Sequence, residues 1–254
     1  MAPFFTEIHA YVLWLSWKCL SDTPDRLKHP AYAILLASHA VLASVCTDAI
    51  HFAPGLLDAV QSDSAPTLSF FENLPVNTRI RGRIRWAVYL LVLRHPKLPN
   101  ARPKIYISSA TASDDGVTGR MDDYKLGRNL SVGVQQALDQ GYRIGHRGLL
   151  CWTDRPQPLL RIQIRALFLL LETVFTLVFW ALKSRTKDYG MPSLCPWDIR
   201  SLAYDGCCTH LSLNEGIAGL KEGLTLEEMN QVEKWRAEKT REDMAQHQGK
   251  STND

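Results

Sequence analysis

Apolar positions recur at helical spacing through the N-terminal part of the chain. Between residues 11 and 20 the apolar residues that recur at this spacing are Tyr11, Leu13, Trp14, Trp17 and Leu20. A pair of prolines interrupts this pattern, and a second apolar stretch follows from Ala31 to Ile50. Its polar residues His39 and Asp48 favour a helix of the protein core over a membrane span. We therefore expect residues 1 to about 53 to be helical.

The pattern changes to period two near residue 78. Four arginines alternate there with apolar or small residues, namely Arg79, Arg81, Arg83 and Arg85. Such alternation is typical of a strand with two different faces. The strand continues as the apolar segment WAVYLLVL, and a proline-rich loop then leads to a second strand over residues 104–110. We expect the two strands to pair as a hairpin with a long loop.

Two short helices, a third strand and a long helix complete the middle of the chain. Residues 116–125 and 131–140 predict the short helices, and residues 142–152 predict the strand. Pro156 and Pro158 open the long helix, which is expected to run to about Lys183, since proline is tolerated in the first turn. This order of elements indicates an α+β fold.

The C-terminal part divides into an irregular segment and a charged helix. Thr225 and Glu228 form a capping-box signature that predicts a helix to about Gln246. The expected organisation is a helical N-terminal extension at 1–78, a central domain at 79–185, a Cys/His-containing extension at 186–222, and a charged helix and tail at 223–254.

The longest apolar run, residues 167–182, bears on membrane association. It has 16 residues and contains Glu172, whereas a membrane span needs about 20 apolar residues. We expect a buried helix and no obligate membrane association, with a membrane-associated accessory protein as an alternative. The first 18 residues lack the basic region of a secretory signal, and the six cysteines show no regular disulfide spacing. An intracellular location follows as an expectation, with nucleus and cytoplasm both open.

Positive charge is concentrated in one segment. The whole chain carries a net charge of only +3, but residues 79–104 hold eight basic and no acidic residues. Residues 1–78 and 186–254 each carry a net charge of −4. The asymmetry predicts an anionic partner, DNA or RNA, near the middle of the chain. The four arginines either follow phosphates or protect an exposed edge strand by their charge.

Several segments together resemble a known nuclease superfamily. They are KIYISSAT, GVTGRMDDY, ALDQGYRIGHRGLLCW, LFLLLETVFTLVFWAL and YGMPSLCPW…YDG, about half of the chain. In order and spacing they resemble the GIY-YIG nucleases, and most closely an uncharacterised GIY-YIG-like family of filamentous fungi. The resemblance implies a three-stranded antiparallel sheet flanked by helices.

The resemblance also implies roles for five residues. Glu172 would hold one Mg²⁺ or Mn²⁺ ion, and Arg120 would stabilise charge on the phosphate. Tyr106 or Tyr124 would activate the water, and Tyr89 would position it. General chemistry agrees, because phosphodiester hydrolysis needs charge neutralisation and a base. The family's motif glycines are replaced by Ala87 and Ser108, which leaves open whether catalysis is retained.

Each of these residues also has a structural interpretation. Glu172 could pair with Arg165, and Arg120 with Asp122 or Asp123. The three tyrosines could pack in the core. Separately, Cys195, Cys208 and His210 have zinc-ligand chemistry, although no CxxC pair is present and buried thiols are the preferred interpretation of the cysteines.

The sequence thus leads to one main functional hypothesis and two alternatives. The main one is a GIY-YIG-like nucleic-acid-binding protein that hydrolyses phosphodiester bonds with Mg²⁺ or Mn²⁺. The alternatives are a catalytically inactive nucleic-acid or protein-interaction module on the same fold, and the membrane-associated accessory protein.

Overall fold

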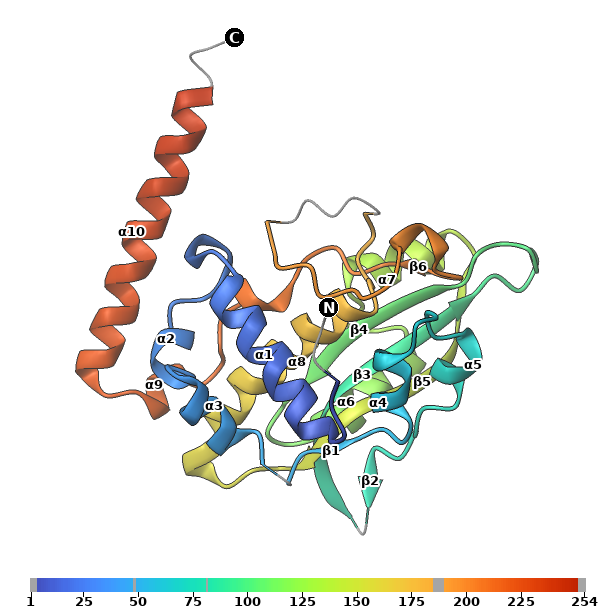
Figure 1. Ribbon diagram of the computed structural model, residues 1–254, viewed down its shortest axis with the longest axis horizontal. Helices are drawn as coiled ribbons and strands as arrows, with labels where there is room; N and C mark the ends of the chain where they lie inside the picture. The colour runs from blue at the N-terminus through green and yellow to red at the C-terminus, as the bar shows by residue number, and fades with distance from the viewer. Residues whose placement is uncertain (1–3, 48, 81, 185–189, 251–254) are drawn as a thin grey trace.

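A central β-sheet organises the computed structural model, which describes residues 4–47, 49–80, 82–184 and 190–250 (Figure 1). Its strand order is β1-β5-β3-β4-β6, and β2 pairs with β3 off this path. The strands are β1 His51–Phe52, β2 Arg79–Ile80, β3 Arg83–Arg94, β4 Lys104–Ala110, β5 Arg143–Asp154 and β6 Asp205–Gly206. The α+β prediction is confirmed. The three long strands lie where the sequence predicts them, whereas the two-residue strands β1 and β6 were not predicted and β2 was expected as the start of the first long strand.

The continuous arginine strand expected from residue 78 onward is wrong. Arg79 and Ile80 form β2, which folds back on β3 so that Ile80 lies opposite Arg83. Gly82 adopts a φ of 75°, in the left-handed region that glycine enters without steric cost. The resulting hairpin breaks the period-two face. Arg81 and the side chain of Arg79 lie outside the described residues.

Helices cover both faces of the sheet. The α-helices are α1 Ile8–Asp22, α2 Tyr32–Leu35, α3 His39–Val45, α4 Leu56–Gln61, α5 Leu68–Glu72, α6 Gly116–Leu126, α7 Val132–Asp139, α8 Arg161–Val178, α9 Leu220–Gly223 and α10 Leu226–Lys250. Short 3-10 turns lie at Asp25–Leu27, Pro158–Leu160, Ile199–Ser201 and Ser212–Asn214. Helix α6 packs on β3 and β4, and α8 packs against the same two strands. Helices α1, α2 and α3 all contact α8, so α8 lies between them and the sheet.

The core is continuous from the sheet into α8. Trp86–Leu93 of β3 has no exposed surface, and α8 is buried from Ala166 to Val178. Helix α8 ends five residues earlier than predicted because the chain turns at Trp180, which has a φ of 45°. After this turn, Leu182 forms an isolated parallel bridge with Cys208.

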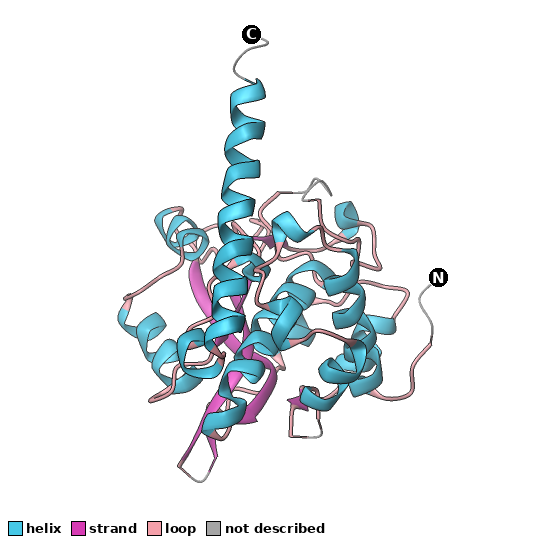
Figure 2. Ribbon diagram, turned by 90° about the vertical axis from the view of Figure 1, so that its left-hand side faces the viewer, coloured by secondary structure: helices cyan, strands magenta, loops and turns pink. Residues whose placement is uncertain are grey.

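The C-terminal helix α10 projects from the rest of the molecule (Figure 2). Its predicted capping box is present, since Glu228 N–H donates to Thr225 Oγ1 and Thr225 N–H donates to Glu228 Oε2. Among the helices of the described ranges, none has the length and apolar character needed to cross a membrane.

Candidate active site

Three of the predicted residues form a buried cluster between the sheet and α6. The hydroxyls of Tyr89 on β3 and Tyr124 on α6 are 2.9 Å apart. Arg120, one turn before Tyr124, donates through Nε to the Tyr89 hydroxyl at 3.2 Å. Its guanidinium also lies over the Tyr124 ring, 4.6 Å from the centroid. The structure thus brings Tyr89, Arg120 and Tyr124 together in a buried cluster and not in an open cleft.

Tyr106 joins this cluster through the pairing of β3 with β4. Tyr89 lies opposite Ser108, so Tyr89, Ser108 and Tyr106 share one face of the sheet. The Ser108 side chain hydrogen-bonds with both Tyr89 and Tyr106. Burial raises the pKa of all three tyrosines, Tyr89, Tyr106 and Tyr124. At neutral pH their phenols are protonated and act as hydrogen-bond donors.

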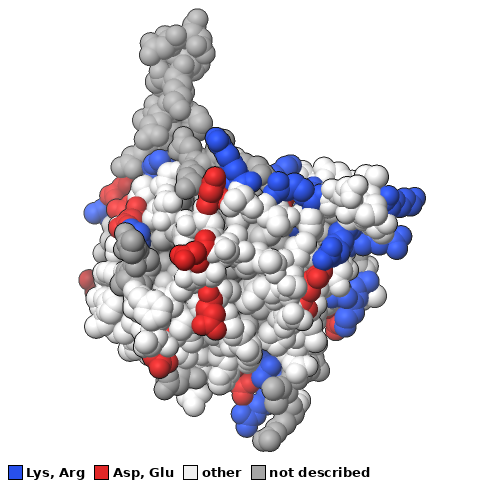
Figure 3. Space-filling view, turned by 45° about the vertical axis from the view of Figure 1, so that its right-hand side comes forward, with Lys and Arg blue, Asp and Glu red and all other residues white. Residues whose placement is uncertain are grey.

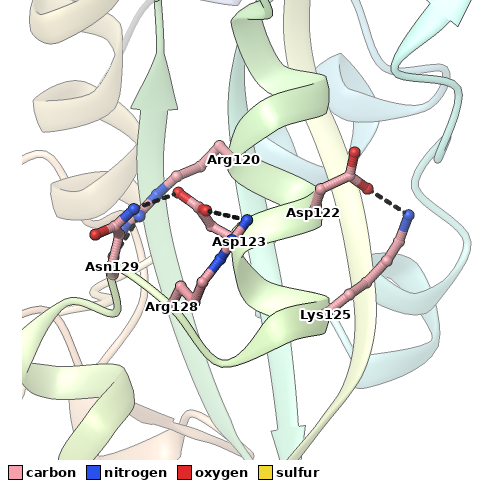
Figure 4. Close-up of polar contacts among 6 residues, drawn as sticks. All are labelled: Arg120, Asp122, Asp123, Lys125, Arg128 and Asn129. Atoms are coloured by element: carbon pink, nitrogen blue, oxygen red, sulfur yellow. Dashed lines mark hydrogen bonds and ion pairs between the residues drawn. The ribbon is translucent and has the colours of Figure 1, made fainter.

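Figure 4 shows why Arg120 is available to this cluster. Asp122 pairs with Lys125 at 2.7 Å, and Asp123 pairs with Arg128 at 3.5 Å. Asp123 also accepts from the Asn129 side chain at 2.9 Å. Arg120 instead donates to the Asn129 carbonyl as well as to Tyr89. Arg120 therefore does not form the ion pair with Asp122 or Asp123 that the structural interpretation expects.

Glu172 reaches the outer edge of β4 from helix α8. Strand β6 pairs with β4 only at Lys104 and Ile105, so the edge further along β4 needs other partners. The Ser109 N–H donates to Glu172 Oε2 at 2.7 Å. Burial raises the pKa of Glu172 from its ordinary 4.5 to about 7, although hydrogen bonds from Ser212 and Ser109 oppose this rise.

Arg165 does not pair with Glu172. Its guanidinium donates to the Thr111 hydroxyl at 3.3 Å and to the Thr111 carbonyl at 3.0 Å. It also lies over the Trp86 ring, 5.0 Å from the centroid. No ion pair links Glu172 to a basic side chain within the described ranges. Among the described residues, the donors to this carboxylate are the Ser109 N–H and the Ser212 hydroxyl, and its charge also acts on His210 in the same pocket.

A pocket of about 170 Å³ opens at this edge, and we call it the Glu172 pocket. Its polar lining includes Tyr106, Ser108, Ser109, Glu172, His210 and Glu215. The pocket brings together Tyr106 and Glu172 from the predicted set. Tyr89, Arg120 and Tyr124 do not line it and lie behind Tyr106 and Ser108.

His210 and Glu215 were not predicted as a pair. His210 Nε2 lies 2.7 Å from Glu215 Oε1, and this hydrogen bond raises the pKa of His210. The sequence marks His210 only as a candidate zinc ligand. No local pattern marks Glu215, because its place in the pocket depends on how residues 205–215 return to the edge of β4.

The zinc set is not brought together. Cys208 Sγ donates to the Ile107 carbonyl at 3.4 Å, and Cys195 Sγ donates to the Trp197 carbonyl at 3.5 Å, while His210 pairs with Glu215. Where side chains are described, there is no group of three or more His, Cys, Asp and Glu residues that could hold a metal ion. All six cysteines are buried free thiols, as in the alternative interpretation.

The described members of the arginine series differ in exposure, because the Arg83 side chain is 74% exposed whereas Arg85 is buried. Arg83 pairs with Asp154 at 3.0 Å. Arg85 is buried, donates to the Asn77 carbonyl at 2.8 Å, and lies 5.3 Å from the Trp152 ring centroid. Its role is structural, because it ties β3 to the segment before β2.

Comparison with known protein-family models, curated proteins and solved structures finds no match.

Proposed function

We propose that this protein is a GIY-YIG-like nucleic-acid-binding protein that hydrolyses phosphodiester bonds at the Glu172 pocket. The observation that carries the proposal is that Tyr106 and Glu172 line one pocket at the open edge of β4. Arg120 and Tyr89 lie directly behind Tyr106 and are linked to it through Ser108. This grouping joins a carboxylate to protonated hydroxyl donors, as phosphate chemistry requires.

The size of the pocket favours a phosphate over a whole small molecule. Its volume of about 170 Å³ is below the roughly 300–1,000 Å³ of typical small-molecule sites. A phosphate group fits such a space, and the rest of its chain would lie outside on the surface. A polymer with repeating phosphates meets this description better than a free nucleotide does.

Glu172 is suited to hold a divalent cation. Its carboxylate has neutral hydrogen-bond donors, and burial disfavours its charged form. A Mg²⁺ or Mn²⁺ ion there would be held by this one carboxylate together with water and substrate oxygens, which is common for Mg²⁺. When bound, the ion would neutralise charge on the phosphate and lower the pKa of a water molecule.

The remaining residues have separate tasks in this proposal. The phenol of Tyr106 donates a hydrogen bond to a phosphate oxygen, because its raised pKa keeps it protonated at neutral pH and leaves no phenolate to act as a base. Arg120 positions Tyr89 and Tyr124 and, through Ser108, Tyr106. The His210–Glu215 pair offers an imidazole at the same pocket.

A nicking assay tests the proposal. Wild-type protein should nick supercoiled plasmid or branched DNA in Mg²⁺ or Mn²⁺, and Glu172→Gln should lower the rate by about 100-fold or more, a typical loss for a charge-stabilising group. Glu222→Gln makes the same change at an exposed position and should cleave normally. Equal cleavage by wild type and Glu172→Gln would show that the pocket is not the active site.

A non-catalytic binding module on the same scaffold is the second candidate. It is favoured by the burial of Tyr89, which has no exposed surface, and by Ser108, whose side chain is bound to two tyrosines. Binding of nucleic acid without turnover by the wild type, in either metal, would select this candidate.

A further inference from the structure

Two lysines are held beside helix α7 by glutamines. Lys104 Nζ donates to Gln140 Oε1 at 2.6 Å, and Lys183 Nζ donates to Gln136 Oε1 at 2.9 Å. Gln136 and Gln140 are four residues apart, so they project from the same face of α7. Lys104 begins β4 and Lys183 follows the turn after α8. Elements that are distant in the sequence thus place two ammonium groups along one helix.

A glutamine orients a lysine without cancelling its charge. Lys18 and Lys125, by contrast, pair with the carboxylates of Asp22 and Asp122. Neither Lys104 nor Lys183 forms an ion pair with an acidic side chain in the described part of the chain. Each ammonium has three N–H donors and uses one on its glutamine, so two remain for an anion.

The two lysines lie near the segment that lines the Glu172 pocket. Both act on the Cys207 thiol, whose pKa burial raises to about 12 while the charges of Lys104 and Lys183 oppose the rise. The next residues of the chain, 208–210, line the pocket. Ser131, the N-cap of α7, also lines it. Along β4, Lys104 and Ser109 are five residues apart, which corresponds to about 17 Å.

The basic surface continues beyond Lys104 at the end of the sheet. The Tyr142 ring lies under Lys104, 4.5 Å from its Nζ, and the exposed Arg143 follows it at the start of β5. Arg143 lies opposite Arg94, and like charges directly across a sheet are unfavourable unless something offsets them. Figure 3 shows lysine and arginine side chains gathered at the upper right of the view, with a few acidic side chains beside them. We call Lys183, Lys104 and Arg143 the basic track.

We propose that a nucleic-acid backbone lies along the basic track and is guided from there into the Glu172 pocket. The choice of a polyphosphate chain rests on the proposed function. Two lysines held beside one helix, with Arg143 next to the Tyr142 ring, suit an extended polyanion, whereas a membrane surface would contact a broad patch. The 17 Å between Lys104 and Ser109 corresponds to about five base steps at roughly 3.4 Å per step along one strand.

A charge change at the glutamines tests the track without removing its lysines. In Gln136→Glu/Gln140→Glu the hydrogen bonds can persist, but each lysine becomes neutralised. Binding of fluorescent single-stranded DNA, duplex DNA and RNA oligonucleotides to the full chain would be measured by anisotropy at several salt concentrations. Affinity should fall by about tenfold or more, and the slope of log K against log salt should fall by about 1.4 to 1.8, as for two lost phosphate contacts.

The control is Gln157→Glu/Gln231→Glu, which changes the net charge equally at two exposed glutamines away from α7. Circular dichroism would verify that both variants are folded. Equal affinity and equal salt slope in the two variants would overturn the proposal. So would binding to phosphatidylserine vesicles, with no binding to any oligonucleotide. If the wild type binds nucleic acid through the basic track but cleaves none, the track is supported and the proposed hydrolytic function is contradicted.

Discussion

At the scale of single residues, the protonation state of Glu172 depends on which groups surround its carboxylate. The residue is 9% exposed, and its carboxylate accepts from the Ser109 N–H and forms no ion pair with a described lysine or arginine, although its charge acts on His210. Burial therefore favours the protonated form, and the pKa rises to about 7. At a pH where Glu172 is ionised in the unfolded chain but protonated in the folded chain, this group lowers the stability of the folded state.

This argument predicts a pH-dependent stability gain in Glu172→Gln. Because the folded pKa lies above the ordinary 4.5, the wild type loses stability as the pH rises from about 4.5 through about 7. The neutral glutamine has no such loss, so the difference in unfolding free energy should grow in its favour by about 3 kcal/mol. Urea denaturation at pH 4 and pH 8 measures it, with Glu222→Gln as control. A pH-independent difference would contradict the assigned shift.

A second residue-scale prediction concerns the tyrosine cluster. Tyr124→Phe removes the hydroxyl that lies 2.9 Å from the Tyr89 hydroxyl in a fully buried setting. The change should destabilise the fold by about 1–2 kcal/mol, because it removes a hydrogen bond from a buried polar group. Tyr142→Phe removes an exposed hydrogen bond to the Arg102 carbonyl and should cost less. Equal thermal shifts in both variants would show that the cluster is not held by this bond.

At the scale of elements, the contact of α7 with the returning C-terminal segment brings Ser131 to the pocket. A Cβ added to Gly133 would lie 1.8 Å from the Cys207 carbonyl oxygen, which is backbone and cannot rotate away. A Cβ at Gly119 of α6 would instead meet the end of the Asp115 side chain. Two helical glycines therefore differ in what surrounds them, although the sequence makes them look alike.

This difference predicts opposite effects of the same substitution. Gly119→Ala should be neutral or stabilising by up to about 1 kcal/mol, since alanine is the better helix former and Asp115 can rotate. Gly133→Ala should destabilise the protein, because α7 must move away from Cys207. Thermal unfolding of the two variants compares them directly. A stabilising Gly133→Ala would show that α7 is not packed tightly against this segment.

Sequence patterns report on neighbouring residues, and this explains which features of the fold could be predicted. The long strands and α8 follow from periodicity and burial, which are properties of neighbouring residues. The turn at Gly82, by contrast, is invisible in an alternating pattern that treats glycine as one more small residue. Tyr106 and Glu172 could be named from a motif, whereas Glu215 joins the pocket only through the return of a distant segment to β4.

At the scale of the whole molecule, helix α8 joins the parts that the sequence divides. One side of it packs on β3 and β4, and α1, α2 and α3 contact it from the N-terminal extension. Strand β1 extends the sheet beside β5, and β6 extends it beside β4. Every segment predicted as an extension of 79–185 except the charged C-terminal helix thus contributes a strand to this sheet. The apolar surface of α8 is therefore covered only when both the sheet and helices α1, α2 and α3 are present.

The last prediction follows from this sharing of α8. A fragment covering residues 79–185 should expose the side of α8 that α1–α3 cover, and should bind the dye ANS and aggregate, because large apolar patches associate. The full chain should lose its far-UV circular dichroism and its tryptophan fluorescence in one coincident urea transition. The fragment would be examined alone and mixed with a peptide covering residues 1–78, which should suppress ANS binding if the missing helices are the cause. A monomeric fragment with a sharp transition of its own would instead establish 79–185 as an autonomous domain.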